Sequence, residues 1–252
     1  MAETARIVDT IDARPRFTAA DVAALNARFA GVDTADMLRA VLTERLAGDA
    51  AVVSSFGAES AVLLHLVGSI DPSVPVLLLD TLKLFPETLA YRDTLVARLG
   101  LTDLRSLQPD PAMLAARDET GLRWSYDPDG CCEIRKVIPL ARALAGFDTS
   151  ITGRKGFQAS TRAGLPRFEL EDGRMKMNPL ASWTKADLDG YFLAHDLPRH
   201  PLEAQGYLSI GCAPCTSIVK PGEDPRSGRW RGWDKVECGI HSDVPGENDP
   251  IF

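Results

Sequence analysis

Apolar and polar positions follow two patterns that alternate along the chain. Short segments predicted as strands occur at residues 51–56, 74–80, 104–109 and 147–153, and the one at 74–80 is apolar up to its last residue, as in a parallel strand buried on both faces. The segments between and after them carry apolar residues at helical spacing, at residues 58–70, 86–100, 111–121 and 131–146. Strand and helix therefore alternate as in βαβ units. The pattern predicts an α/β fold with a mainly parallel, doubly wound sheet, whose ligands bind at the carboxyl ends of the strands.

The flanking segments predict additional elements. Two amphipathic helices are expected at residues 18–30, with Thr18 as a possible cap, and at 34–48. A hairpin is expected at 167–180, turning at Asp172-Gly173, and a helix capped by Thr184 should follow it. The predicted organisation is an N-terminal helical segment (1–48), an α/β domain (49–222) and a flexible C-terminal segment (223–252).

Proline affects two of these expectations. Pro139 lies inside the predicted helix at 131–146 and requires that helix to end or kink, because proline cannot donate the backbone hydrogen bond. From Pro198 onward proline, glycine and charged residues dominate, and little regular structure is expected.

Charge and composition narrow the class of protein. The 252 residues carry a net charge of −7, which argues against bulk nucleic-acid binding but permits a local site for a small anion. The first 17 residues lack the apolar core of a signal peptide, and no apolar run is long enough to span a membrane. We therefore expect a cytoplasmic protein with no membrane partner. The oligomeric state stays open, and a homo-oligomer is compatible with the sequence.

The five cysteines form a group of four and a single one. The four are an adjacent pair and a C-x-x-C turn, a pattern typical of metal ligands: Cys131, Cys132, Cys212 and Cys215. Disulfide bonds among them are not expected in a cytoplasmic protein. Neighbouring side chains on a helix diverge by about 100°, so one zinc ion would strain the adjacent pair, and a cube-shaped iron–sulfur cluster tolerates it better. On such a helix Arg135 and Lys136 lie one turn from the cysteine pair, where their positive charges would offset the negative charge of a four-thiolate cluster. The alternative is that the pair is simply buried in the core.

Three stretches are candidate anion sites. "SSFGAES" (54–60) joins a strand to a helix and offers backbone N–H groups, although many α/β strands end in such residues for turn geometry alone. "TGRKGFQASTRAG" (152–164) clusters Arg154, Lys155 and Arg162, and its other interpretation is a solvated surface loop. "RSGRWRGWDK" (226–235) interleaves arginine and tryptophan; with the negative net charge, we favour wrapping over a bound anion above nucleic-acid contact.

The fifth cysteine, Cys238, lies in "ECGIH" ahead of a polar tail. A thiolate is the reactive form of cysteine, and Lys235 and His241 favour it whereas Glu237 opposes it. Charge alone leaves the reactivity of this thiol undecided, and its position in a polar, flexible segment suggests a reactive group.

Together these stretches resemble the assimilatory sulfonucleotide reductases, which reduce adenosine 5′-phosphosulfate (APS) or its 3′-phosphorylated form (PAPS). The matching motifs run in the family's order from about residue 50 to residue 241: "SSFGAES", "LDTLKLFPET", "CCEIRK", "TGRKGFQASTR", "GCAPCT", "RSGRW" and "ECGIH". The cysteine set together with "ECGIH" is the specific part of this resemblance.

The resemblance implies an ATP-pyrophosphatase-like (adenine nucleotide alpha hydrolase-like) fold and the roles of particular residues. It implies that Cys131, Cys132, Cys212 and Cys215 ligate a [4Fe–4S] cluster, and that Cys238 attacks the sulfur of APS, so that AMP leaves and an S-sulfocysteine remains. Thioredoxin or glutaredoxin then releases sulfite, as in sulfate assimilation. The implied substrate contacts are Ser54, Ser55, Phe56, Gly57, Leu79, Asp80, Thr81, Lys136, Arg162, Arg226 and Arg229.

Two departures from the family pattern affect the substrate. Leu82-Lys83 stands where members usually have Gly-Arg, and Gly156-Phe157 stands in the basic loop where a charged residue is more usual. Members with the cluster cysteines generally use APS, which favours APS here. Lys83 or Lys155 could instead meet the 3′-phosphate of PAPS.

Two other classes of protein share parts of this pattern. A sulfur-inserting ATP pyrophosphatase acting on tRNA shares the fold but predicts an S-G-G-x-D-S loop, which "SSFGAES" does not match. A non-catalytic zinc or redox module would leave Cys238 and the arginines without a function.

Overall fold

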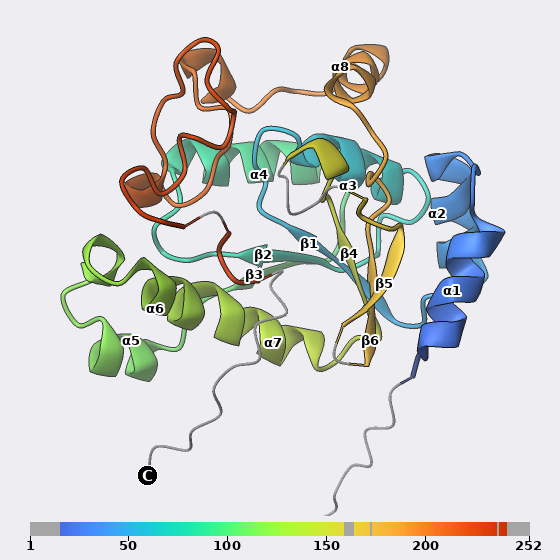
Figure 1. The fold of residues 1–252 in the computed structure, drawn as a ribbon, viewed down its shortest axis with the longest axis horizontal. Coiled ribbons are helices and arrows are strands. Elements are labelled where there is room, and N and C mark those ends of the chain that lie inside the picture. The colour runs from blue at the N-terminus through green and yellow to red at the C-terminus, as the bar shows by residue number, and fades with distance from the viewer. Residues whose placement is uncertain (1–15, 159–163, 172, 236, 241–252) are drawn as a thin grey trace, which may run out of the picture.

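The computed structural model describes residues 16–158, 164–171, 173–235 and 237–240. These residues contain a six-stranded sheet in the order β3-β2-β1-β4-β6-β5 (Figure 1). All neighbouring strands are parallel except the β5–β6 pair. The predicted mainly parallel α/β sheet is confirmed; its strands are β1 (Ala50–Ser54), β2 (Val76–Leu79), β3 (Leu104–Leu107), β4 (Thr149–Thr152), β5 (Phe168–Glu171) and β6 (Arg174–Met177).

Helices cover both faces of the sheet, as a doubly wound fold requires (Figure 1). On one face lie α3 (Ser60–Gly68) and α4 (Pro86–Leu99). On the other lie α5 (Pro111–Arg117), α6 (Pro128–Cys132) and α7 (Ile138–Leu144). Proline at the start of α4 and a left-handed Gly100 at its end punctuate that helix as predicted.

The two N-terminal helices are α1 (Ala19–Arg28) and α2 (Thr34–Thr43). Thr18 caps α1 through a reciprocal capping box with Asp21, as the sequence indicated. Helix α2 stops at Thr43 rather than continuing to residue 48, because Arg45 adopts a left-handed backbone conformation (φ 53°). Asn26 of α1 exchanges hydrogen bonds with the backbone of Phe168, so this helix covers edge strand β5.

The predicted hairpin is present as β5 and β6; Gly173 has a left-handed backbone (φ 75°), and Asp172 lies outside the described residues. Helix α8 (Lys185–Ala194) follows, capped by Thr184. Beyond Pro198, the described part of the chain has no longer helix or strand; it contains short 3₁₀ turns at Glu203–Gln205 and Ala213–Cys215 and isolated β-bridges at Cys212 and between Thr216 and Arg229. None of the helices in the described ranges has the length and apolar content to cross a membrane.

Pro139 changes the helix that carries the adjacent cysteines without ending it. The chain passes from α6 through a π-helical turn, Glu133–Val137, into α7, where Pro139 is the second residue. A π turn bonds each N–H one residue further back, so it accommodates a residue that cannot donate. The expected end or kink is therefore a local widening of the helix.

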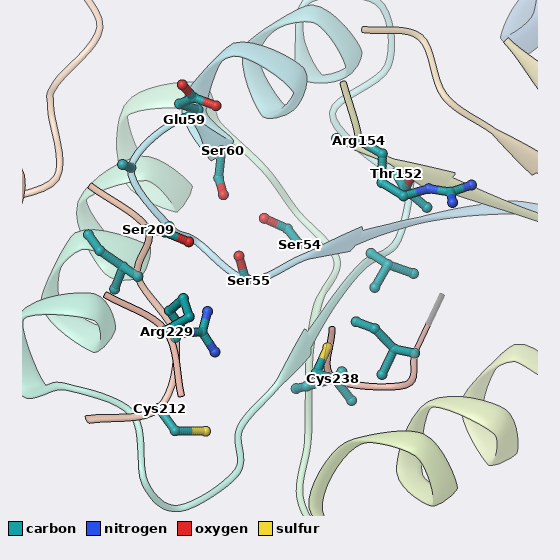
Figure 2. Close-up of a pocket in the computed structure, with 18 of the residues that line it drawn as sticks. Ser54, Ser55, Glu59, Ser60, Thr152, Arg154, Ser209, Cys212, Arg229 and Cys238 are labelled. Atoms are coloured by element: carbon teal, nitrogen blue, oxygen red, sulfur yellow. The ribbon is translucent and has the colours of Figure 1, made fainter. Parts of the chain in front are cut away.

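Strand β1 is central, because it pairs with β2 on one side and β4 on the other. The strand order reverses at this point, which is where open α/β sheets bind ligands. Figure 2 shows Ser54 at the end of β1 and Thr152 at the end of β4 facing one shared space.

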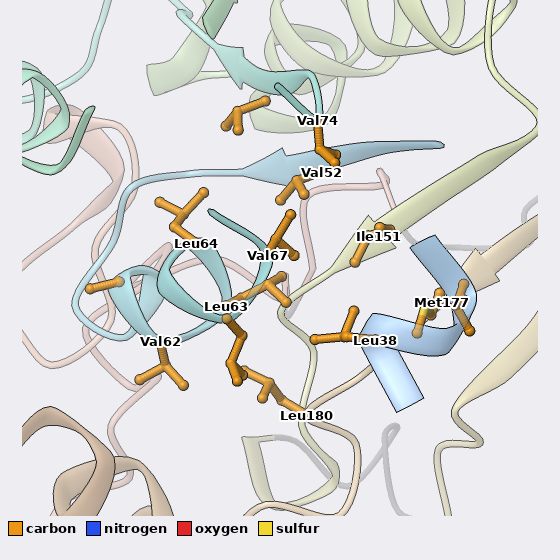
Figure 3. Packing of buried hydrophobic residues seen from close by; sticks show 14 of the residues in the cluster. Leu38, Val52, Val62, Leu63, Leu64, Val67, Val74, Ile151, Met177 and Leu180 are labelled. Atoms are coloured by element: carbon orange, nitrogen blue, oxygen red, sulfur yellow. The ribbon is translucent and has the colours of Figure 1, made fainter. Parts of the chain in front are cut away.

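The main hydrophobic core lies between the sheet and helices α2, α3, α4 and α8. Figure 3 shows Val52 and Ile151 of the sheet close to Leu64 and Val67 of α3 and Leu38 of α2. Adjacent strand residues point to opposite faces, so Ala51 belongs to a second, smaller core against Leu140 of α7. This two-sided packing fixes the strand ends that form the site.

Candidate functional site

A pocket of about 240 Å³ lies at the carboxyl edge of the sheet (Figure 2). Its walls come from the ends of β1, β2 and β4 and from two later segments, around residues 208–212 and 226–240. Nine residues expected in the site line it: Ser54, Ser55, Gly57, Leu79, Thr81, Lys136, Arg226, Arg229 and Cys238.

The serine-glycine loop forms one wall and leads into α3. Ser54 accepts a hydrogen bond from the backbone N–H of Phe56, which is held in a left-handed conformation (φ 48°). The Phe56 side chain lies in the main core and does not line the pocket. A Cβ at Gly57 would lie 3.4 Å from the carbonyl oxygen of Ile210, so glycine suits the close approach of these segments.

The turn after β2 forms the second wall. Leu79 and Thr81 line the pocket, whereas Asp80 does not. The Asp80 carboxylate accepts hydrogen bonds from the backbone of Leu82 and the side chain of Gln108, so it stabilises the turn.

At the start of the basic loop after β4, Arg154 and Lys155 are buried rather than solvated, while Phe157 is exposed. Arg154 pairs with Glu169, and Lys155 lies 2.8 Å from Glu59. Both charges are thus balanced by carboxylates, which the sequence did not indicate. Arg162, also expected here, lies outside the described residues.

Three other cations line the pocket. Arg226 pairs with Glu237 at 3.2 Å, and Arg229 stacks over Trp230, 4.3 Å from the ring centre. The guanidinium of Arg229 also lies against Gly211, where an added Cβ would be 2.3 Å from Nη2. The third cation, Lys136, is buried. Desolvation lowers the pKa of Lys136, but the negative charge of the nearby cysteine thiolates outweighs this and raises the pKa above its ordinary value.

The four cysteines of the predicted ligand set line one small cavity beside the pocket. Cys131 and Cys132 come from α6, and Cys212 and Cys215 from the turn between residues 211 and 216. Burial raises the pKa of Cys132 to about 11. Burial acts the same way on Cys212, but Lys136 and the Thr81 hydroxyl, 3.2 Å from the sulfur, bring its pKa below the ordinary value.

The side chains around this cavity are mainly thiols and cations. All five cysteines are free thiols, and within the described ranges no three His, Cys, Asp or Glu side chains are arranged to hold a single metal ion. Four thiols around one cavity, with Lys83, Arg135 and Lys136 also lining it, nevertheless suit an anionic group with several metal corners. The buried indole N–H of Trp230 lacks a hydrogen-bond acceptor among the described residues, and the backbone N–H of this residue donates to Cys215. The chemistry of the residues fits a cluster.

Lys136 and Cys212 line both cavities. The larger pocket and the cysteine cavity therefore share a wall, and the charge of Lys136 acts on both. The sequence predicted that Lys136 would lie near Cys132, and their electrostatic coupling in the structure agrees with that placement.

Cys238 is partly exposed and lines the larger pocket. In Figure 2 it lies across the pocket from Arg229. Three anchors hold its segment: Lys235 pairs with Asp129 of α6, Glu237 pairs with Arg226, and Ile240 packs on the smaller core. Lys235 is thus engaged by a carboxylate, and His241 lies outside the described residues.

The two residues of the Leu82-Lys83 departure lie in different surroundings. Leu82 adopts a left-handed conformation (φ 58°), which glycine accepts without strain. Lys83 lines the cysteine cavity and not the larger pocket. Lys155, the other lysine considered for a 3′-phosphate, lines the larger pocket.

Comparisons with known proteins agree with this architecture. Residues 49–218 match the model of the phosphoadenosine phosphosulfate reductase domain. A protein of Mesorhizobium japonicum named adenosine 5′-phosphosulfate reductase is 52% identical, over 88% of each chain. One of the same name from Chelativorans sp. is 56% identical, over 79% of this chain and 80% of its own.

Among solved structures, a phosphoadenylyl-sulfate reductase from Candida auris, in complex with phosphate, is similar to this chain with a TM-score of 0.67. It is 25% identical, and the match covers 81% of this chain and 98% of that one. The resemblance drawn from the motifs is confirmed, and with it the adenine nucleotide alpha hydrolase-like fold. The chain belongs to the phosphoadenosine phosphosulfate reductase family.

Proposed function

We propose that this protein reduces adenosine 5′-phosphosulfate to sulfite and AMP, with thioredoxin or glutaredoxin as electron donor. The observation that carries the proposal is the position of Cys238, which shares one pocket with the Ser54–Gly57 loop, Arg226 and Arg229. A nucleophilic thiol, a backbone-rich loop and cations together suit attack on a nucleotide anion.

The first half-reaction is a displacement at sulfur. The Cys238 thiolate forms a bond to the sulfur of APS, and the bond between that sulfur and the phosphate oxygen breaks. AMP leaves with the electron pair on its phosphate oxygen, and the enzyme keeps an S-sulfocysteine. Arg226, Arg229 and Lys136 line the same pocket, and in this proposal they stabilise the charge that develops on the leaving oxygen.

The second half-reaction needs an external dithiol. A thiolate of the reductant attacks Sγ of Cys238, sulfite leaves, and a mixed disulfide forms, which the second thiol of the reductant resolves. The reductant must therefore reach a sulfur that also faces the nucleotide. The anchors at Lys235, Glu237 and Ile240 would have to release for this step.

We also propose that Cys131, Cys132, Cys212 and Cys215 hold a [4Fe–4S] cluster in the smaller cavity. When bound, the cluster supplies a fixed anionic group next to the substrate pocket. The protein's contribution is Lys136, whose ammonium lines both cavities and can respond to charge in either. Its position supports electrostatic tuning of the substrate site.

We propose APS as the preferred substrate, because relatives bearing that name are more than half identical to this chain. PAPS is the alternative, named for the similar Candida auris structure. Lys155 is the cation that would serve a 3′-phosphate, and its pairing with Glu59 opposes that role. Neither tRNA sulfur insertion nor a redox module accounts for the placement of Cys238 opposite the arginines.

The test is anaerobic assay of the purified chain with APS, thioredoxin and a thioredoxin-reducing system. Sulfite and AMP should form in equal amounts, and Cys238→Ser should form neither. Iron and acid-labile sulfide, measured on the same preparation, should each approach about four per chain. Absence of sulfite with both APS and PAPS would refute the proposed activity, and zinc without sulfide would refute the cluster.

A further inference from the structure

We propose that Arg135 and Asp118 form a positioning pair that sets the two halves of the cysteine set against each other. The inference rests on the proposed function, because the cysteine set matters through the cluster it would hold. Arg135 lies in the π turn immediately after Cys131 and Cys132, and Asp118 lies at the end of α5.

The pair is enclosed within the protein. The Arg135 side chain is 6% exposed and that of Asp118 0%. Nη2 and Nε of Arg135 donate to the same oxygen of Asp118, at 2.6 and 3.2 Å, and the other oxygen accepts the backbone N–H of Arg123 at 2.8 Å. Such a buried ion pair is weak evidence for stability, because desolvation offsets much of the attraction. We infer that the Arg135–Asp118 ion pair instead serves to hold the guanidinium in one orientation.

The remaining donor of Arg135 reaches the other side of the cavity. Nη1 donates to the backbone oxygen of Thr81 at 2.8 Å. The hydroxyl of Thr81 lies 3.2 Å from the sulfur of Cys212, and the next residues of this turn pair with the backbone of Cys212 and Ala213. One guanidinium therefore connects the helix of Cys131 and Cys132 to the turn of Cys212 and Cys215.

The requirement for arginine follows from this geometry. The planar guanidinium donates in two fixed directions at once, toward Asp118 and toward Thr81. A lysine ammonium keeps the charge but has no such rigid fork. Neighbouring Lys136 lines both cavities, whereas Arg135 lines only the cysteine cavity. The two cations of the π turn therefore have different tasks.

The first test compares Arg135→Lys and Asp118→Asn with wild type after anaerobic cluster reconstitution. Loss of a group that orients metal ligands typically costs roughly 10–100-fold in metal affinity, so iron should be lost to a chelator at least about tenfold faster in both variants. Lys176→Gln, which removes a buried cation paired with Glu171 far from either cavity lining, is the control for general destabilisation. The proposal would be overturned if the two variants lost iron as slowly as wild type. It would also be overturned if they lost iron at the same rate as a Lys176→Gln control with the same melting temperature.

The second test uses metal-free protein and so does not depend on the cluster. A short bis-alkylating reagent should join the peptide of Cys131 and Cys132 to the peptide of Cys212 and Cys215 in wild type. The yield of this crosslink should fall in both variants but not in the control. An unchanged yield would overturn the positioning role. Wild-type protein that takes up no iron would refute the cluster, while the crosslink result would still decide the positioning.

Discussion

Arg229 should matter more to catalysis than Arg226, although both line the pocket. Arg226 already shares its charge with Glu237 at 3.2 Å. Among the described residues, Arg229 instead donates to the neutral carbonyl of Cys215 and stacks on the ring of Trp230. A unit charge about 4 Å from a developing anion is worth about 4 kcal/mol at an effective dielectric constant of 20. For Arg226, the neighbouring carboxylate of Glu237 should reduce this stabilisation of the anion to about half.

Arg229→Ala should therefore lower kcat/KM for sulfite release by about 4 kcal/mol, roughly a thousandfold, and Arg226→Ala by about 2 kcal/mol, roughly thirtyfold. The assay is steady-state reduction of APS with thioredoxin in excess. Arg231→Ala is the matched control, since Arg231 lies in the same loop, pairs with Glu223 and does not line the pocket. The reasoning fails if the two pocket variants lose the same activity, or if Arg229→Ala stays within about threefold of wild type.

Three further outcomes are expected. Lys235→Ala removes the pair with Asp129, worth about 1 kcal/mol, so Cys238 should be alkylated roughly fivefold faster without substrate; an unchanged rate by mass spectrometry would contradict the anchoring role. Burial lowers the pKa of His200 to about 4, below the ordinary 6.5. As the pH falls from 6.5 to 4, the unfolded chain takes up a proton that the folded chain does not, and stability should fall by up to about 3 kcal/mol; urea unfolding should show a weaker pH dependence in His200→Gln, and equal slopes would refute this. APS should have a higher kcat/KM than PAPS, and the reverse order would implicate Lys155.

Local signals in the sequence were sufficient for the elements of the fold. Strands such as Val76–Leu79 are wholly buried and therefore read as continuous apolar runs. Thr18 and Thr184 cap their helices through bonds to residues three positions away, so a short window contains the whole signal. The cysteine spacing likewise identified four candidate ligands, and the structure brings the pair from α6 and the pair from the turn at 211–216 around one cavity.

Long-range pairing was not predictable in the same way. Glu59 meets Lys155 across 96 residues, and Asp129 meets Lys235 across 106. No local pattern identifies which carboxylate balances which cation, so the basic loop could be identified as a site but not as one whose charges are paired. The π turn before Pro139 was also missed, since proline signals only that regular α-helical bonding must change.

The central claim is that Cys238 is the nucleophile that takes sulfur from APS, and mass spectrometry of the trapped intermediate tests it most directly. Wild-type protein incubated with APS and no thiol reductant should gain about 80 Da, the mass of SO₃, on the peptide that contains residue 238, as two-step covalent catalysis requires. Added thioredoxin should remove this mass and release sulfite. An adduct on any of the other four cysteines, or sulfite release by Cys238→Ser, would contradict the account.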